Sequence, residues 1–165
     1  MRSGGPPSSR SPMVRANLRL FLSWYEILGG VAATATTVIV HFVAGHTLSL
    51  NQWSATLAPF GIVMAAGIRL RNGSHRSEWL SIAVQGAQLF YWSFPSSSWK
   101  FCAGVFAPIW IEPNRSGAFL GLDASIVVNA ANPKDPPVIG LNLAALVTIV
   151  LLVRLMRAGG GAGAN

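Results

Sequence analysis

The chain has few charged residues, a single cysteine and none of the common catalytic motifs. Charged residues make up 10% of its 165 residues, whereas a soluble domain carries about 25%, so the chain cannot cover a large water-facing surface. The lone Cys102 excludes an intramolecular disulfide and any zinc or iron–sulfur site built on several cysteines. We expect Cys102 to be a buried apolar residue rather than a reactive thiol.

Carboxylates are also scarce, and this disfavours an enzyme. Only five Asp and Glu residues are present, and the sequence contains no nucleophile elbow, HExxH zinc motif, P-loop or dinucleotide-binding fingerprint. His41 and His46 are five positions apart, so they do not share a helix face as paired metal ligands do. The prediction is a non-enzymatic protein without a metal or another cofactor.

Long apolar segments are what the chain has in abundance, and they predict an integral membrane protein. Hydrophobic residues make up 52% of the sequence, and four segments are apolar enough to lie in lipid: 20–43, 53–70, 79–94 and 138–156. The predicted fold class is all-α, a four-transmembrane-helix bundle over residues 15–157. Each segment also has two small residues four positions apart, a spacing that favours close helix packing: Gly30 and Thr34, Gly61 and Ala65, Ala83 and Ala87, Gly140 and Ala144.

The two ends of the chain are poor in large apolar residues. We therefore predict a disordered tail over residues 1–14 and a flexible tail over residues 158–165. Met13 is an alternative start of the protein. The first apolar segment also permits a cleavable signal peptide, but Glu26 interrupts the apolar run that such a peptide needs.

Basic residues are distributed unevenly around the four segments. Most of the twelve Lys and Arg residues precede the first segment, lie at the loop between the second and third, or lie at the end of the fourth. By the positive-inside rule, this predicts a multi-pass protein of the inner (plasma) membrane with both termini in the cytoplasm. The net charge of +7 then reflects topology, and nucleic acid is not an expected partner. The basic residues on the other side are balanced by carboxylates: Lys100, Arg115 and Lys134 against Glu112, Asp123 and Asp135.

Residues 95–137 are predicted to form a small extracytoplasmic β-hairpin between the third and fourth helices. Two runs of β-favouring residues, 99–111 and 118–129, flank a turn-like stretch at 113–117. A two-stranded hairpin is only marginally stable by itself, so we expect its apolar side chains to contact the membrane interface or a partner. A re-entrant element is the alternative. The predicted interaction surface consists of Phe101, Phe106, Ile109 and Trp110.

Polar residues inside the apolar segments are the candidates for function. Burying the charge of Glu26 in lipid is costly, so we expect an ion pair with Arg154 or Arg69, and the alternative is a proton- or cation-linked site. The amides of Gln85, Gln88 and Asn142 are expected to form hydrogen bonds between helices. If those amides converged with Glu26 on one cavity, they would instead line a polar pathway.

Two functions are compatible with this architecture. The first is a non-enzymatic subunit or assembly protein of a larger membrane complex, which would bind through lipid-facing helices and the outer hairpin. Its partners would be the lipid bilayer and either another membrane protein or further copies of the same chain. The alternative is a small transporter or channel component with Glu26 and the amides along its pathway. For a membrane enzyme, the sequence offers no catalytic set.

Overall fold

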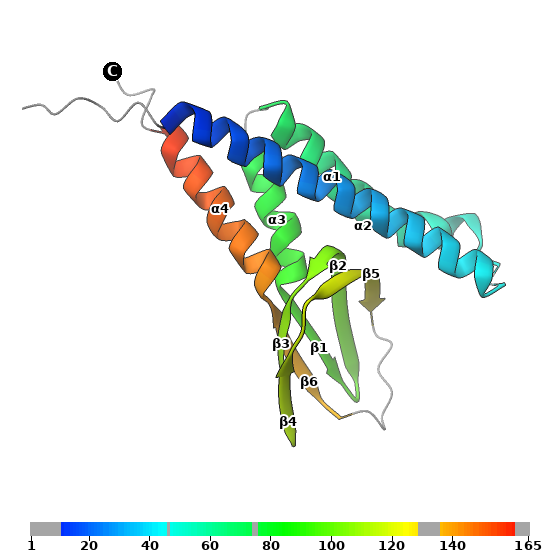
Figure 1. The fold of residues 1–165 in the computed structure, drawn as a ribbon. Coiled ribbons are helices and arrows are strands. Elements are labelled where there is room, and N and C mark those ends of the chain that lie inside the picture. The colour runs from blue at the N-terminus through cyan, green and yellow to red at the C-terminus, as the bar shows by residue number, and fades with distance from the viewer. Residues whose placement is uncertain (1–10, 46, 74–75, 129–135, 161–165) are drawn as a thin grey trace, which may run out of the picture.

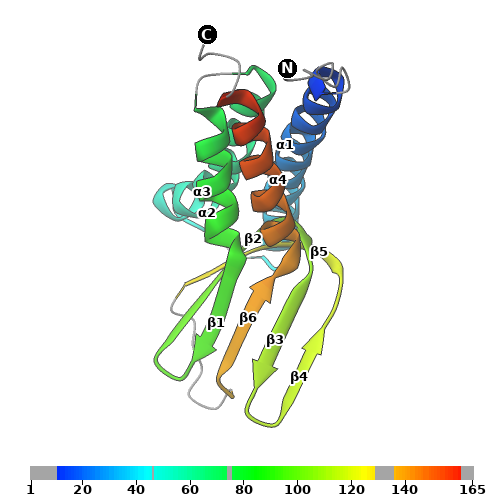
Figure 2. The same ribbon diagram turned by 90° about the vertical axis from the view of Figure 1, so that its left-hand side faces the viewer.

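The computed structural model describes residues 11–45, 47–73, 76–128 and 136–160. Within these ranges the chain forms four helices and a six-stranded antiparallel sheet (Figure 1). The prediction of an all-α bundle with four membrane-spanning helices is therefore wrong. The helices pack against one another, and the strands extend away from the ends of the third and fourth helices, whereas the first two helices continue past the sheet (Figures 1 and 2).

Helices α1 (Ser11–Val43) and α2 (Leu50–Arg71) form a helical hairpin. α1 begins before the first predicted span, so residues 11–14 of the predicted tail are helical, whereas residues 1–10 lie outside the described part. α2 begins at a capping box, in which the side chains and backbones of Ser49 and Gln52 bond reciprocally. Among the described residues, two helices are long and apolar enough to cross a membrane by length and composition, and they are α1 and α2.

The third and fourth predicted spans each combine a helix with a strand. α3 (Ser77–Leu89) runs directly into β1 (Phe90–Phe94), and β6 (Val138–Asn142) runs directly into α4 (Leu143–Gly160). The two strands pair with each other in an antiparallel ladder. The 13 residues of α3 rise by about 20 Å, less than the ~30 Å thickness of the hydrocarbon layer. Hydropathy does not distinguish an apolar helix from an apolar strand, which explains why both segments were predicted as membrane-spanning helices.

The segment predicted as an isolated outer hairpin supplies most of the sheet. Its strands are β2 (Ser97–Phe106), β3 (Pro108–Glu112), β4 (Arg115–Ala118) and β5 (Gly121–Val128), and the order is β4-β3-β6-β1-β2-β5. β2 and β5 pair as the two predicted runs were expected to. The first run, however, breaks at Ala107, and the predicted turn connects β3 to β4. Residues 129–135, with Lys134 and Asp135, lie outside the described part.

The sheet is curled, so that strands distant in its order meet at one corner. β4 and β5 lie at opposite edges of the order, yet only residues 119–120 connect them, and Ala107 by itself connects β2 to β3. Connections this short span at most about 11 Å, so the strand ends must lie close together. The backbone N–H of Phe119 donates a hydrogen bond to the carbonyl of Pro108 at 3.3 Å, which extends the ladder between β3 and β4 up to this junction. We call the junction at Ala107 the β2–β3 corner.

Both ends of the described chain lie at one end of the helical layer. α1 begins there and α4 ends there (Figure 2). α4 continues to Gly160, so the first part of the predicted tail 158–165 is helical, and residues 161–165 lie outside the described part. An apolar cluster packs the helices at this end: Leu22, Leu70, Leu152 and Leu155.

A second apolar cluster joins the helical hairpin to β2. Phe60 of α2 and Phe101 of β2 are both buried in it, with ring centroids 6.0 Å apart. Backbone contact is unusually close where α1 crosses β2, because a Cβ atom at Gly29 would lie 2.6 Å from the carbonyl oxygen of Ala103. Gly104, with φ of 118°, faces the same point of α1. This crossing fixes the sheet against the helices.

The predicted small-residue pairs contribute unequally to packing. Gly30 does face α2, since a Cβ atom there would lie 2.9 Å from the Phe60 carbonyl. By contrast, a Cβ atom at Gly61 would meet nothing within 4 Å, and Gly140 lies in β6 beneath the ring of Tyr91. The spacing of small residues four positions apart therefore located the contact of Gly30 with α2, but such spacing does not identify which helix face is buried.

Candidate functional site

Glu26 is the centre of a buried polar contact between α1 and α3. It is 1% exposed. Its Oε2 accepts a hydrogen bond from Ser81 Oγ at 2.8 Å, and its Oε1 accepts one from Gln85 Nε2 at 3.3 Å. The expected ion pair with Arg154 or Arg69 is not formed within the described ranges, where both arginines are exposed. The hydroxyl of Ser81 and the amide of Gln85 therefore bond to Glu26 where the sequence predicted the guanidinium of an arginine.

α3 turns a polar face toward the interior of the helical layer. Residues three or four apart share a helix face, and Trp79 is exposed on the other side of α3. A helix of a water-soluble domain has the reverse arrangement, with its polar face in solvent. Gln85 and Gln88, both predicted candidates, belong to this buried face. Its buried polar residues are Ser77, Glu78, Ser81, Gln85 and Gln88.

Gln88 extends the polar contact from the helices to the sheet. Its Oε1 accepts a hydrogen bond from the backbone N–H of Ala103 in β2 at 2.9 Å. Gln88 Nε2 and Gln85 Oε1 are buried without a hydrogen-bond partner in the described part of the chain. We call Glu26, Ser81, Gln85 and Gln88 the Glu26 cluster. It joins α1, α3 and β2 through hydrogen bonds, and it has one donor and one acceptor that no described residue satisfies.

A second polar contact joins α1 to α3 two turns before Glu26. Arg19 Nη2 lies 2.6 Å from Glu78 Oε1. Burial acts to raise the pKa of Glu78, but hydrogen bonds from its own backbone, Arg19 and Ser77, together with the charge of Arg19, outweigh burial and hold the pKa below its usual value. The sequence interpretation missed this pair. The sequence did contain a signal for it: Arg19 and Glu26 are seven residues apart and therefore share a face of α1, so both could contact the same neighbouring helix.

Asn142 lies at the junction of β6 and α4, apart from the Glu26 cluster. Its Oδ1 accepts hydrogen bonds from the backbone N–H groups of Ala107 at 3.1 Å and Ala144 at 3.2 Å. It thereby caps the start of α4 and holds the β2–β3 corner against it. The structure brings Gln85 and Gln88 to Glu26, but it does not bring Asn142 there.

The residues of the predicted interaction surface do not share one exposed face. Phe101 and Phe106 are buried. The ring of Phe106 packs edge-on against Tyr91, at 5.5 Å between centroids. Ile109 is exposed, whereas Trp110 is half-buried. Alternation along a strand separates these residues onto opposite faces of the sheet.

An exposed apolar row crosses three neighbouring strands instead. Ile111 of β3 is opposite Ile139 of β6, and Ile139 is opposite Trp92 of β1, so the three side chains share a face. They are 67%, 56% and 37% exposed. Ile109 and Phe90, two residues away on the outer strands, are exposed on the same face. We call these five residues the exposed sheet face, and contiguous apolar patches of this kind are typical of binding surfaces.

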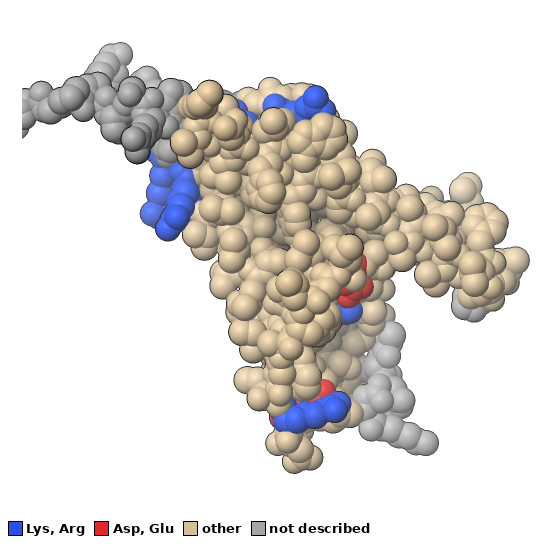
Figure 3. All heavy atoms as spheres, viewed as in Figure 1, with Lys and Arg blue, Asp and Glu red and all other residues tan. Residues whose placement is uncertain are grey.

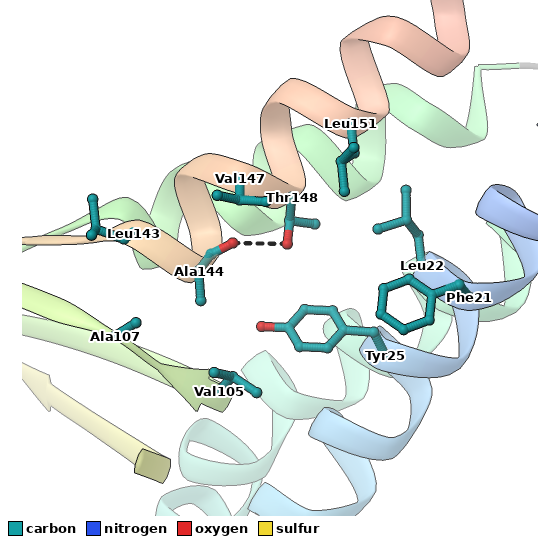
Figure 4. Close-up of a pocket in the computed structure, with 10 residues that line it drawn as sticks. All are labelled: Phe21, Leu22, Tyr25, Val105, Ala107, Leu143, Ala144, Val147, Thr148 and Leu151. Atoms are coloured by element: carbon teal, nitrogen blue, oxygen red, sulfur yellow. Dashed lines mark hydrogen bonds between the residues drawn. The ribbon is translucent and has the colours of Figure 1, made fainter. Parts of the chain in front are cut away.

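A cleft with a volume of about 360 Å³ lies between α1, α4 and the β2–β3 corner (Figure 4). Its lining includes Phe21 and Tyr25 from α1 and Ala144, Thr148 and Leu151 from α4. The Thr148 hydroxyl donates a hydrogen bond to the Ala144 carbonyl at 2.9 Å, within its own helix. Apart from the hydroxyls of Tyr25 and Thr148, the side chains of this α1–α4 cleft are apolar.

Arginines gather at the end of the helical layer where α1 begins and α4 ends (Figure 3). The end of α2 also reaches this region, where the guanidinium of Arg71 lies 4.8 Å from the ring centroid of Trp24. We call this region the basic end. Its described basic residues are Arg15 and Arg19 of α1, Arg69 and Arg71 of α2, Arg76 before α3, and Arg154 and Arg157 of α4.

The described residues contain no group of three or more His, Cys, Asp or Glu side chains arranged to hold a metal ion. His41 lies beside Trp53, with ring centroids 5.3 Å apart, and its Nδ1 donates a hydrogen bond to the Thr37 carbonyl at 2.9 Å. His46 lies outside the described part. His41 therefore serves the contact between α1 and α2.

Cys102 is buried in β2, as predicted. Burial raises the pKa of its thiol to about 12, so the folded protein presents little thiolate at neutral pH. Since Cys102 is the one thiol of the chain, its alkylation reports unfolding.

Comparisons with protein-family models, with curated proteins and with solved structures found no match to this chain.

Proposed function

We propose that the protein is an integral membrane protein, anchored by the α1–α2 hairpin, that acts as a non-enzymatic subunit or assembly protein of a larger membrane complex. The observation that carries the membrane assignment is the outward exposure of both apolar helices. In the most apolar windows of α1 and α2, 22% and 28% of the residues are buried, whereas the core helix of a water-soluble protein is mostly buried. An apolar surface of this length is favourable in lipid and costly in water.

The contacts of α1 favour a retained helix over a cleaved signal peptide. Arg19 and Glu26 bond to α3, and Gly29 and Gly30 fit closely against β2 and α2. Removal of α1 would leave Ser81, Gln85 and Glu78 without these partners. A buried polar group without its partner costs about 1–3 kcal/mol, so α1 is expected to be part of the mature fold.

The basic end supports an inner-membrane location with both ends of the chain in the cytoplasm. α1 begins and α4 ends there (Figure 2), and arginines from all four described helices or their flanks surround it. Positively charged flanks remain on the cytoplasmic side during insertion.

The exposed sheet face supports a protein partner. It presents Ile and Trp side chains on β-strands rather than on a helix long enough to span lipid. Aromatic and aliphatic residues are enriched at the buried centres of protein interfaces, where charged residues are depleted. We expect another membrane protein to cover this face.

The Glu26 cluster favours the subunit over the transporter alternative. Its carboxylate accepts hydrogen bonds from two side chains of a neighbouring helix, which is the arrangement of a structural contact in a membrane protein. Asn142, the remaining amide of the expected pathway, is engaged at the start of α4.

The membrane assignment is tested by fractionating cells that express the protein with a C-terminal tag. The protein should stay in the membrane pellet after alkaline carbonate and should be released by detergent, because two apolar helices anchor it. A luminal or secreted soluble protein run in parallel controls for the carbonate wash. Recovery of the protein in the carbonate supernatant would contradict membrane insertion.

The subunit assignment is tested by the composition of the protein purified in mild detergent. We expect a second chain to copurify at a fixed ratio, and Ile139→Asp, which places a charge in the exposed sheet face, should abolish that copurification. Leu122→Asp is the matched control, since Leu122 is an exposed apolar residue of β5 outside this face. A closed ring of this chain without other proteins would support the transporter or channel alternative instead.

A further inference from the structure

The α1–α4 cleft has the size and lining of a site for one hydrocarbon chain. Its volume of about 360 Å³ lies within the range of small-molecule sites, about 300–1,000 Å³. One turn of a helix with its side chains, about 10 Å wide and 5.4 Å long, already occupies roughly 400 Å³, so a partner helix does not fit. The one hydroxyl that Figure 4 shows reaching toward the β2–β3 corner is that of Tyr25.

The cleft opens on the side of the helical layer. Phe21 of α1 and Val147 of α4 line it and are both exposed. If α1 crosses the membrane as proposed above, these residues face the acyl chains of the surrounding lipid. An acyl chain can therefore enter the cleft sideways without passing through water.

Two arginines follow the cleft along α4 and α1 toward the basic end, outside its lining. Arg154 follows the lining residue Leu151 by three positions, about 4.5 Å further along α4, and Arg15 precedes Leu22 by seven positions on α1, on the same helix face. Within the described ranges, neither arginine forms an ion pair with a carboxylate. They supply positive charge that has no anionic partner among the residues that the structure describes.

We propose that the α1–α4 cleft binds one acyl chain of an anionic phospholipid, with the phosphate of that lipid at Arg154 and Arg15. The hydrocarbon fills the apolar cleft, and the headgroup lies at the basic end, where inner-leaflet phosphates would be. This inference rests on the proposed membrane location of α1. It assigns the protein a defined lipid as a ligand in addition to its protein partner.

The test uses the full chain reconstituted into phosphatidylcholine vesicles that contain a small fraction of a photoactivatable lipid. The probe is phosphatidylglycerol with a diazirine in one acyl chain, and the comparison probe is phosphatidylcholine with the same chain. After illumination, mass spectrometry should locate the adducts at residues 21–25 and 143–151. Phosphatidylglycerol should give more adduct there, by about five-fold for each arginine, because a basic residue near an anionic surface contributes about 1 kcal/mol.

Two variants separate the acyl chain from the headgroup. Ala144→Phe fills the cleft and should abolish labelling by both probes, whereas Leu146→Phe, on the same helix but outside the cleft lining, should leave labelling unchanged. Arg154→Gln should lower phosphatidylglycerol labelling toward that of phosphatidylcholine. Protection of Cys102 from alkylation verifies that each variant is folded.

Three outcomes overturn the inference or its basis in distinguishable ways. Equal labelling of the Ala144→Phe and Leu146→Phe variants would exclude an acyl chain in the cleft. Equal labelling of the wild-type protein by the two probes would exclude recognition of the anionic headgroup. Failure of the wild-type protein to insert, seen as its release from the vesicles by carbonate, would overturn the membrane assignment itself.

Discussion

Glu26→Ala is expected to lower the free energy of unfolding by about 2 kcal/mol, because it leaves the buried donors of Ser81 and Gln85 without their acceptor. Among the described residues, the cluster already holds one donor and one acceptor without hydrogen-bond partners, so loss of the carboxylate adds to an existing cost. The measurement is pulse alkylation of Cys102 across a urea series in mild detergent, in which the midpoint of thiol exposure should move to lower urea.

Glu26→Gln is the matched variant for this prediction. The amide keeps one oxygen as the acceptor for Ser81. Once the Gln85 amide turns over, the new N–H can donate to Gln85 Oε1, which replaces the bond from Gln85 Nε2 and uses an acceptor that lacks a partner in the described residues. We therefore expect its urea midpoint to lie close to that of the wild-type protein. If Gln destabilised the protein as much as Ala, the charge of the carboxylate would be the essential property, and the proton- or cation-linked interpretation would replace the structural one.

Gly29→Ala is expected to lower the free energy of unfolding by about 2 kcal/mol. In a helix interior, alanine is more stabilising than glycine by about 1 kcal/mol of helix propensity. The new methyl group would, however, lie 2.6 Å from the carbonyl oxygen of Ala103, and overpacking costs up to about 3 kcal/mol. The colliding atom belongs to the backbone of β2, so no side-chain rotation relieves the contact, and the collision outweighs helix propensity.

Gly61→Ala supplies the control, since a Cβ atom there would meet nothing within 4 Å. This variant should be unchanged or stabilised by up to about 1 kcal/mol. Both variants are measured by thermal unfolding in the same detergent, with Cys102 alkylation as the probe. Equal midpoints for the two variants would show that α1 and β2 are not held in contact at Gly29.

Local sequence patterns were sufficient to predict the two helices of the α1–α2 hairpin. The predicted spans 20–43 and 53–70 both lie within observed helices, because the apolar runs there are longer than any strand and arginines or loop residues bound them. The arginines of the basic end were likewise readable from the chain, since they flank these runs. Burial of Cys102 followed from its chemistry and its surroundings.

The same reasoning failed where helix and strand adjoin. An apolar run that passes from α3 into β1 has the hydropathy of one continuous helix, and its division at Leu89 depends on the pairing of β1 with β6, almost fifty residues later in the chain. The hairpin prediction found two strands that do pair, β2 and β5. It also placed the turn that connects β3 to β4, but it could not show that β1 and β6, which lie in the predicted third and fourth spans, complete the sheet.

For the candidate site, the sequence identified polar residues but not their partners. Glu26 and Gln85 were candidates because polar groups in an apolar run must bond to something. Ser81 was not among them, although it precedes Gln85 by one helical turn, and the expected partner of Glu26 was an arginine. Which donor reaches the carboxylate depends on the rotation of α3 against α1.

Of the four apolar helices that the sequence predicted, it determined by itself the two long ones, α1 and α2, together with the basic residues that flank them and the polar residues that interrupt the apolar runs. These properties depend on composition and on residues close together in the chain. Only the tertiary structure decided that α3 and α4 continue into a shared sheet, that Glu26 bonds to Ser81 and Gln85, and that a cleft separates α1 from α4. Each of these depends on contacts between segments far apart in the chain, whose free energy is gained only when both segments are in place.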